Sequence, residues 1–207
     1  MLNIRSTALL VFSTVFCSLP SYAGLIDNGF FTTDTATNTD WLDLTLTANK
    51  SYNEVVSGYG DYLADGWTYA SEDQVYDLFR NAGARLQYFG FTSHNKAAAQ
   101  QLGELLGFNG IYTYNGNKSL MSLGLTSTVS VGKLETPGFA LSINGLHGDR
   151  HYSGQFAQTW NSTFDERHEL MGSFLIRPAQ ASIPEPSTLA ILAIGIAGLT
   201  SRRLSKK

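Results

Sequence analysis

Cysteine is almost absent from this chain. The 207 residues include a single one, Cys17, and it lies in an apolar stretch near the N-terminus that we expect to be removed from the mature protein. Without cysteine, the mature protein can form no disulfide, no thiolate nucleophile and no cysteine metal site. A domain of about 160 residues that lacks such links must be held together by burial of its apolar core, which is feasible at that size.

Basic residues are also scarce between the two ends of the chain. The whole sequence has 14 Lys and Arg against 17 Asp and Glu; without the five basic residues and one acidic residue of the terminal segments, residues 24–180 keep 9 against 16. This part therefore has a net charge of about −7. Nucleic acids and anionic lipids are bound through clustered Lys and Arg, so we expect no nucleic-acid partner. A negative surface is compatible with divalent cations or with neutral polysaccharide.

Catalytic motifs are missing as well. The sequence contains no G-x-S-x-G elbow, no HExxH helix and no glycine-rich phosphate loop. A serine together with His94 or His168 could be proposed as a catalytic pair, but such a combination can be found in most sequences. We therefore expect no catalytic residue and a protein that is not an enzyme. The alternative is a secreted hydrolase that acts on polysaccharide through paired carboxylates.

Residues 1–23 have the layout of a secretory signal peptide. Arg5 supplies the positive charge, residues 8–19 are the apolar stretch, and the small Ala23 completes a cleavage site. We expect signal peptidase to cut between Ala23 and Gly24. A transmembrane anchor would need about 20 apolar residues, and this run is shorter.

Residues 181–207 fall into three zones. Pro184-Glu185-Pro186 is stiff and extended, because each proline fixes its own φ and restricts the residue before it. Ser187 can then cap an apolar helix over residues 188–200. At 1.5 Å per residue this helix is roughly 20 Å long, short of the ~30 Å hydrocarbon core of a bilayer.

A basic tail, residues 201–207, ends the chain. The positive-inside rule keeps this tail on the cytoplasmic side of a membrane and leaves the domain outside. Its charged residues are Arg202, Arg203, Lys206 and Lys207.

This order of zones resembles the PEP-CTERM sorting signal of bacterial exosortase substrates. The resemblance implies that an exosortase, a membrane enzyme similar to cysteine transpeptidases, processes the chain near residues 184–186. It also implies that the precursor is held transiently in the inner membrane by the C-terminal helix. The product would reach the cell surface or the extracellular matrix of a Gram-negative bacterium. A plain tail anchor is the alternative.

Residues 24–180 are expected to form one α+β domain. Capping-box patterns predict helices that begin after Ser51 and Ser71, and a third helix is expected over 95–106. Helices followed by strands favour an α+β fold, with about three short helices in the N-terminal half and an antiparallel sheet mainly in the C-terminal half. A β-sandwich with inserted helices is the alternative. The expected strands are 25–31, 41–46, 111–114, 120–131, 139–143, 147–152, 155–160 and 169–176.

Parts of this domain are similar to lectin-like domains of the collagen-like adhesin C-terminal type. The similarity rests on Asp34–Leu44, Gly66–Ser71 and the closing segment Gly172–Arg177. It implies a C-type-lectin-like fold, in which the first and last strands pair.

Three groups of side chains are candidates for ligand binding. Oxygen ligands for calcium could come from Asp34, Asp40 and Asp43, or from Asp61 and Asp65, although loop aspartates commonly just close turns. No other cofactor is expected.

The second group is His147, Asp149 and His151, which share one face if the segment is extended and could then hold zinc. Solvated histidines in a turn are the alternative. In the third group, Trp67 and Tyr69 after Gly66 are either core residues or a stacking platform for a sugar.

The sequence therefore predicts an exported envelope or extracellular-matrix protein sorted by an exosortase. We expect its domain to act without catalysis in adhesion, carbohydrate binding or the biofilm matrix, with extracellular polysaccharide as the partner.

Overall fold

The structure is a computed structural model that describes residues 24–88, 90–144 and 154–180. Four of the predicted features lie outside the described residues: the signal peptide at 1–23, the sorting signal at 181–207, the strand expected over 147–152, and the group His147, Asp149 and His151.

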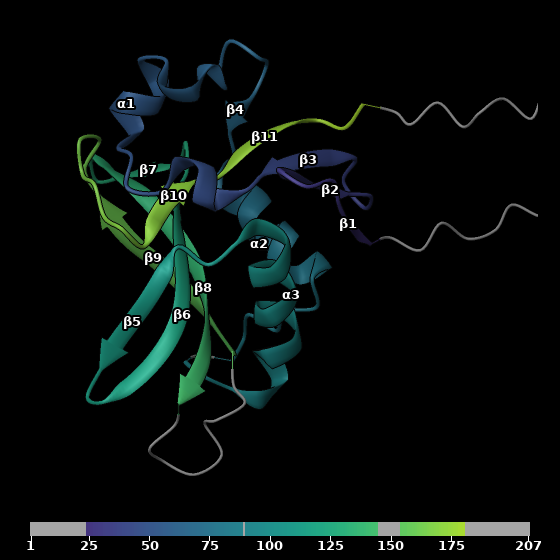
Figure 1. Cartoon of the computed structure of the whole chain (residues 1–207), viewed down its shortest axis with the longest axis vertical. Helices are drawn as coiled ribbons and strands as arrows, with labels where there is room; N and C mark the ends of the chain where they lie inside the picture. Colours follow the sequence, from purple (N-terminus) through teal and green to yellow (C-terminus); the bar gives the residue numbers. More distant parts are fainter. Residues whose placement is uncertain (1–23, 89, 145–153, 181–207) are drawn as a thin grey trace, which may run out of the picture.

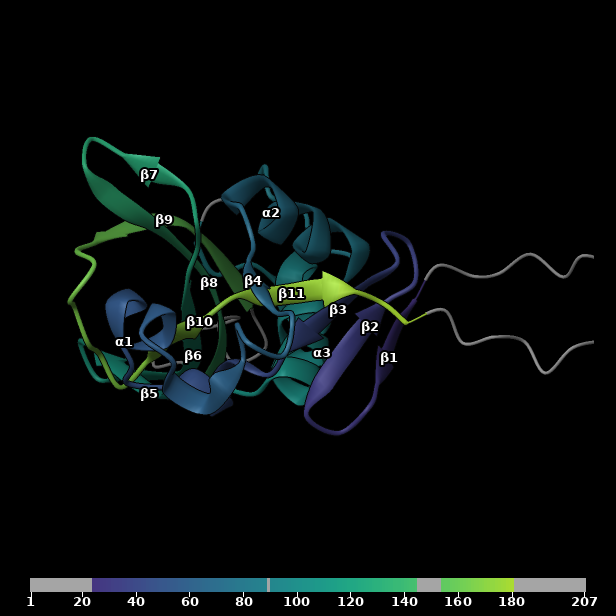
Figure 2. The ribbon, with the colours of Figure 1, turned by 90° about the horizontal axis from the view of Figure 1, so that it is seen from above.

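Five short antiparallel strands form the first sheet, in the order β1, β2, β3, β11, β4 (Figure 1). Their bounds are β1 Leu25–Asp27, β2 Phe31–Asp34, β3 Thr39–Leu42, β4 Thr68–Tyr69 and β11 Leu175–Pro178. The last strand of the domain is thus inserted between two strands from its beginning. As a result, the described chain starts and ends on the same side of the domain (Figures 1 and 2).

The second sheet has the order β10, β6, β8, β7, with β5 beside β6 and β9 beside β8. Its strands are β5 Gly110–Tyr114, β6 Asn117–Leu125, β7 Val129–Ser130, β8 Lys133–Asn144, β9 Gly154–Ser162 and β10 Met171–Ser173. The pair β10 and β6 is parallel, and the other pairs are antiparallel. Pro137 lies inside β8 at a register shift in its pairing with β9, where a strand tolerates a proline.

Three α-helices are present among the described residues: α1 Tyr52–Val56, α2 Glu72–Asn81 and α3 Lys96–Leu106. Three short 3-10 helices accompany them: η1 Leu44–Thr47, η2 Tyr59–Asp61 and η3 Ser93–Asn95. Capping boxes begin α1 and α2, because the side chains of Ser51 and Ser71 each accept a hydrogen bond from the backbone N–H three residues later.

The main core lies where α2 and α3 meet the two sheets. Phe79 of α2 is fully buried, and its ring centre is 4.8 Å from that of Phe156 and 6.1 Å from that of Phe139 in the second sheet. Trp41 of the first sheet belongs to the same cluster. In α3, Gly103 leaves room for the ring of Phe108, which would lie 1.9 Å from a Cβ at that position. The burial of Trp41 in this cluster fixes the first sheet against the helices.

The domain is a mixed α+β structure, as expected, but the predicted arrangement within it is wrong in two respects. The N-terminal half also supplies strands β1 to β4 of a separate sheet, and the second sheet contains one parallel pair. The parallel pair and the place of β4 in the first sheet arise because β10 and β11 return to strands far away in the sequence, and no local pattern encodes such pairing. By contrast, β1, β2 and β3 pair with their neighbours in the sequence.

Several predicted strands also have wrong ends. The stretch 25–31 is broken by a turn in which Gly29 has φ +93° and its N–H bonds to the Asp27 carboxylate. Residues 32–40, which separate the first two predicted strands, contain most of β2 and the start of β3. In the stretch 41–46 the strand ends at Leu42, since η1 directs Leu44 into the main core while Leu42 packs in another cluster.

Candidate functional site

The two faces of the first sheet have different surroundings. On the inner face, Trp41 and Ile176 pack in the main core, and the hydroxyl of Thr32 donates to the carbonyl of Leu105 in α3. On the outer face, a separate apolar cluster covers part of the sheet. This cluster consists of Leu42, Val55, Trp67 and Leu175.

The rest of the outer face is hollowed into a groove of about 590 Å³, a volume in the range of small-ligand sites. We call it the sheet groove. Its lining residues are Ile26, Asn28, Phe31, Thr33, Thr35, Asn38, Asp40, Arg177, Ala179 and Gln180.

A row of four paired residues crosses the sheet groove. Ile26 pairs with Thr33, Thr33 with Asp40, and Asp40 with Arg177, so the row runs over β1, β2, β3 and β11 in register. Directly paired residues on neighbouring strands present their side chains on the same face of a sheet. The row therefore places an apolar, a hydroxyl, a carboxylate and a guanidinium group side by side.

Asp40 is the anchor of this row. It is only 2 % exposed, and both of its carboxylate oxygens have donors. The hydroxyl of Thr33 donates to Oδ1 at 2.7 Å, and Nε of Arg177 donates to Oδ2 at 3.1 Å. The amide of Asn28 in turn donates to the Thr33 hydroxyl at 2.9 Å. A buried carboxylate needs such partners. These hydrogen bonds link the side chains of Asn28, Thr33, Asp40 and Arg177 into one network.

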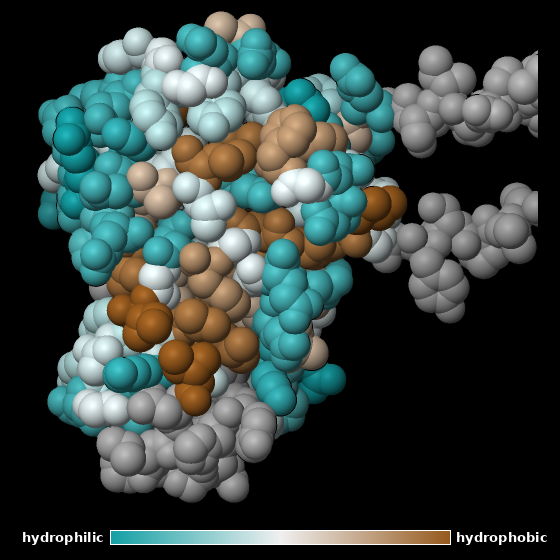
Figure 3. All heavy atoms as spheres, viewed as in Figure 1, coloured by the Kyte–Doolittle hydropathy of each residue, from teal (hydrophilic) through white to brown (hydrophobic). Residues whose placement is uncertain are grey.

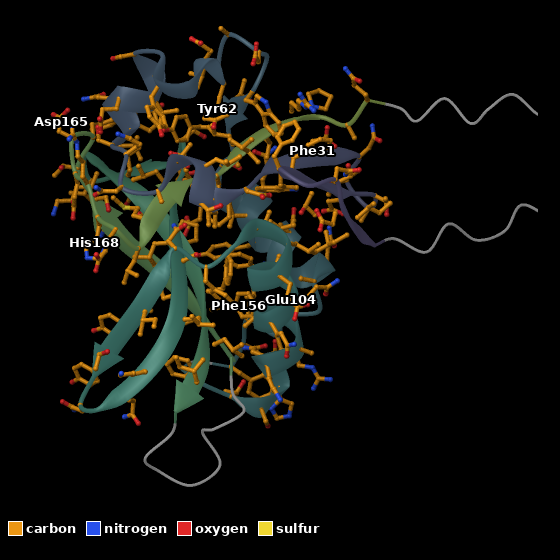
Figure 4. All side chains as sticks on the ribbon, viewed as in Figure 1. Phe31, Tyr62, Glu104, Phe156, Asp165 and His168 are labelled. Carbon is orange, nitrogen blue, oxygen red and sulfur yellow. The ribbon has the colours of Figure 1, made fainter. Side chains whose placement is uncertain are left out.

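Two aromatic rings hold the guanidinium of Arg177. Its central carbon lies 4.4 Å from the ring centre of Trp67 and 5.0 Å from that of Phe31, which is labelled in Figure 4. The two rings meet edge to face at 6.2 Å. Cation–π contacts of this kind fix both the position and the plane of an arginine. The Arg177 side chain remains 24 % exposed, so part of its guanidinium is open to the groove.

The structure does not bring the predicted calcium ligands Asp34, Asp40 and Asp43 together. Asp34 is fully buried on the opposite face from Asp40, and its two oxygens accept hydrogen bonds from the N–H of Ala36 and the amide of Asn81. Asp61 is an exposed part of η2, and Asp65 is exposed just after it. Within residues 24–88, 90–144 and 154–180, no group of three or more His, Cys, Asp or Glu side chains is arranged to hold a metal ion.

Asp43 has an unusual environment of its own. It follows β3, it is half-buried, and its Oδ1 atom is buried without a hydrogen-bond partner among the described residues. Burial, with a smaller contribution from the charge of Asp27, raises the pKa of Asp43 from 3.8 to about 6.

Trp67 and Tyr69 are core residues rather than an open platform for a sugar. Trp67 is 2 % exposed beneath Arg177, and Tyr69 stacks on Tyr52 with 4.3 Å between ring centres. Neither His94, which stacks on Tyr88, nor His168, whose Nδ1 accepts from the N–H of Leu170, contacts the sheet groove.

The residue that sequence reasoning missed is Arg177. The sequence places it only within the closing segment 172–177, whereas the structure gives it the central position in the groove. The sequence does contain one signal for it. Arg177 is a charged residue in an otherwise apolar strand, and it lies on the same face of β11 as Leu175. That signal does not identify Asp40 or Trp67 as its neighbours.

A second surface feature lies on the larger sheet, where Figure 3 shows apolar side chains gathered over β5 and β6. Ile111 is 53 % exposed and pairs with Leu120, which pairs in turn with Leu141. The side chains of Ile111, Leu120 and Leu141 carry no hydrogen-bonding group. The sheet groove is therefore the better candidate for binding a polar ligand.

Comparison with known proteins identifies the sorting signal. A family model described as the PEP-CTERM protein-sorting motif matches residues 182–204. This match confirms the predicted resemblance and makes the chain an exported, envelope-sorted substrate whose processing partner is an exosortase.

No curated protein and no solved structure gives a significant match to the chain. The C-type-lectin-like fold is therefore not supported, although β11 does pair with β3. No helix among the described residues is long and apolar enough to cross a membrane.

Proposed function

We propose that this protein is a component of the extracellular matrix or cell surface that binds extracellular polysaccharide through the sheet groove, without catalysis. The precursor is held in the inner membrane of a Gram-negative bacterium by its C-terminal apolar segment until the exosortase acts. The mature domain then works outside the cell in adhesion or matrix assembly.

The observation that carries this proposal is the composition of the sheet groove. Sugars are bound by hydrogen bonds to their hydroxyl groups together with some apolar contact. Side-chain amides line the groove at Asn38 and Gln180, and Ile26, which is 52 % exposed, adds an apolar wall. The N–H donors of Asn28 and the hydroxyl of Thr35 also lie there, but they already bond to the protein itself. The fixed guanidinium of Arg177 adds further donors.

The lining of the groove also favours binding over hydrolysis. Hydrolysis of a glycosidic bond normally uses two carboxyl groups on either side of it. Asp40 is the only acidic residue that lines the groove in the described part of the chain, and both its oxygens are already engaged. The groove therefore offers no acid and base pair.

A glycan array followed by product analysis tests the proposal. The labelled mature protein, purified from producing cells, is expected to be retained on one or more polysaccharides, and no oligosaccharide is expected to be released on prolonged incubation. A variant with Asn38→Ala and Gln180→Ala should lose retention, while the surface variant Gln100→Ala on α3 should keep it. Absence of retention on every glycan, or release of oligosaccharides, would refute the proposal.

A further inference from the structure

The sheet groove contains a cationic donor with one side fixed and the other side open. Arginine has five N–H donors, and Nε of Arg177 is bonded to Asp40. Among the described residues, the structure gives no hydrogen-bond acceptor to the two Nη atoms of Arg177. The aromatic contacts with Trp67 and Phe31 prevent the side chain from turning elsewhere. The Nη edge is therefore a rigid pair of parallel donors to which no described residue supplies an acceptor.

A carboxylate matches this edge best. Its two oxygens can accept two parallel hydrogen bonds from a guanidinium, and such charge-assisted pairs are roughly twice as strong as bonds between neutral groups. A sugar hydroxyl would engage only one Nη atom, and in its bond only the donor would be charged. Because Arg177 is already held in place, a ligand carboxylate would bind with little loss of side-chain freedom.

The net negative charge of the domain does not oppose this match in the groove itself. Exposed charges are largely screened beyond about 8 Å at physiological ionic strength, so the local groups decide. The one acidic group in the groove lining, Asp40, is buried behind Arg177 and is itself compensated by that residue and by Thr33. The ligand would meet the Nη edge first.

We infer that the sheet groove binds an acidic polysaccharide by its uronic acid residues, with the sugar carboxylate on the Nη edge of Arg177. This inference rests on the proposed function and specifies its ligand. The sugar hydroxyls would then be bound by the amides of Asn38 and Gln180 and by the carbonyl oxygen of the Asn28 amide, all of which line the same groove; the N–H groups of Asn28 already donate to Ile26 and Thr33. These amides favour a uronate over the carboxylate of a peptide, which brings no comparable set of hydroxyl groups.

Binding to polygalacturonate and to its fully methyl-esterified form separates carboxylate recognition from polysaccharide binding in general. The two polymers differ only in whether the carboxylate is free or esterified. The mature protein, with EDTA present, is expected to bind the acid form at least about tenfold more tightly. Arg177→Gln should remove this preference. Arg80→Gln, which loses the same charge at an exposed position of α2, should retain it.

Equal affinity for both polymers would overturn the carboxylate inference and leave polysaccharide binding intact, whereas binding to neither polymer nor any other glycan would overturn both. Tighter binding to a peptide carboxylate than to polygalacturonate would also overturn the inference. If Arg177→Gln fails to fold, Arg177→Lys keeps the charge without the paired donors, and a preference as large as in the original protein would refute the role of the Nη edge.

Discussion

Replacing Asp43 by Asn should make the protein more stable at neutral pH. In the folded protein the pKa of Asp43 is raised to about 6, from 3.8, so folding favours the protonated carboxyl group. The stabilising contribution of that proton is fully present below about pH 4 and is lost as the pH rises through about 6. At neutral pH the folded protein therefore holds a carboxylate in an unfavourable place, and the neutral amide of asparagine removes this cost.

The magnitude follows from the same difference in pKa. The interval between 3.8 and about 6 corresponds to at most roughly 3 kcal/mol. Asp43 is only half-buried, and solvent screening reduces this limit to about 1 kcal/mol. For a domain of this size, such a gain raises Tm by about 2–4 °C.

Thermal unfolding measured from about pH 4 to about pH 8 tests this reasoning. The Asp43→Asn variant should match the original protein at the acid end and exceed it at the upper end. Asp65→Asn, in an exposed position, is the matched control and should leave Tm nearly unchanged. Asp27→Asn should give a smaller gain, since Asp27 is the lesser cause of the shift. A gain for Asp43→Asn that is the same at every pH, or a loss at neutral pH, would refute the argument.

Three further predictions concern sorting, the groove and metal binding. Replacing residues 184–186 by three alanines should leave the full-length precursor in the inner membrane, and immunoblots of cell fractions would show it; unchanged processing would contradict the assignment. Asp40→Ala should lower the free energy of unfolding by about 2–3 kcal/mol in urea titrations, because it leaves Arg177 and Thr33 without their acceptor; Asp65→Ala should change it little. Calcium should not raise Tm relative to EDTA, since the carboxylates of Asp34 and Asp40 already have donors and lie on opposite faces; a rise that depends on calcium concentration would show a site that these contacts do not predict.

The parts of the fold that could be predicted from the sequence are those encoded by neighbouring residues. The capping boxes at Ser51 and Ser71 join groups three residues apart, and helices follow both. Asn115 and Gly116 both have positive φ and join β5 to β6, as the Asn-Gly pair predicts. Such signals need no knowledge of the rest of the chain.

The sheet groove depends instead on contacts between distant residues. The bond from Arg177 to Asp40 spans 137 residues, and it exists only because β11 enters the first sheet next to β3. The amino-acid composition does not predict this pairing. The net charge of about −7 for residues 24–180 also conceals the one positively charged guanidinium that is fixed in the groove, that of Arg177.

The position of β11 has a mechanical consequence. A protein sorted through its C-terminus would be loaded at that end when the bound matrix is pulled. Arg177 is only three residues before Gln180, the last residue described before the sorting signal, so tension between ligand and attachment point would cross one strand rather than the whole domain. Because β11 is hydrogen-bonded to β3 on one side and β4 on the other, a pull along its length would shear both sets of bonds at once. Under the proposed function, the residue that binds the ligand and the end of the domain that leads to the sorting signal would therefore lie on the same strand.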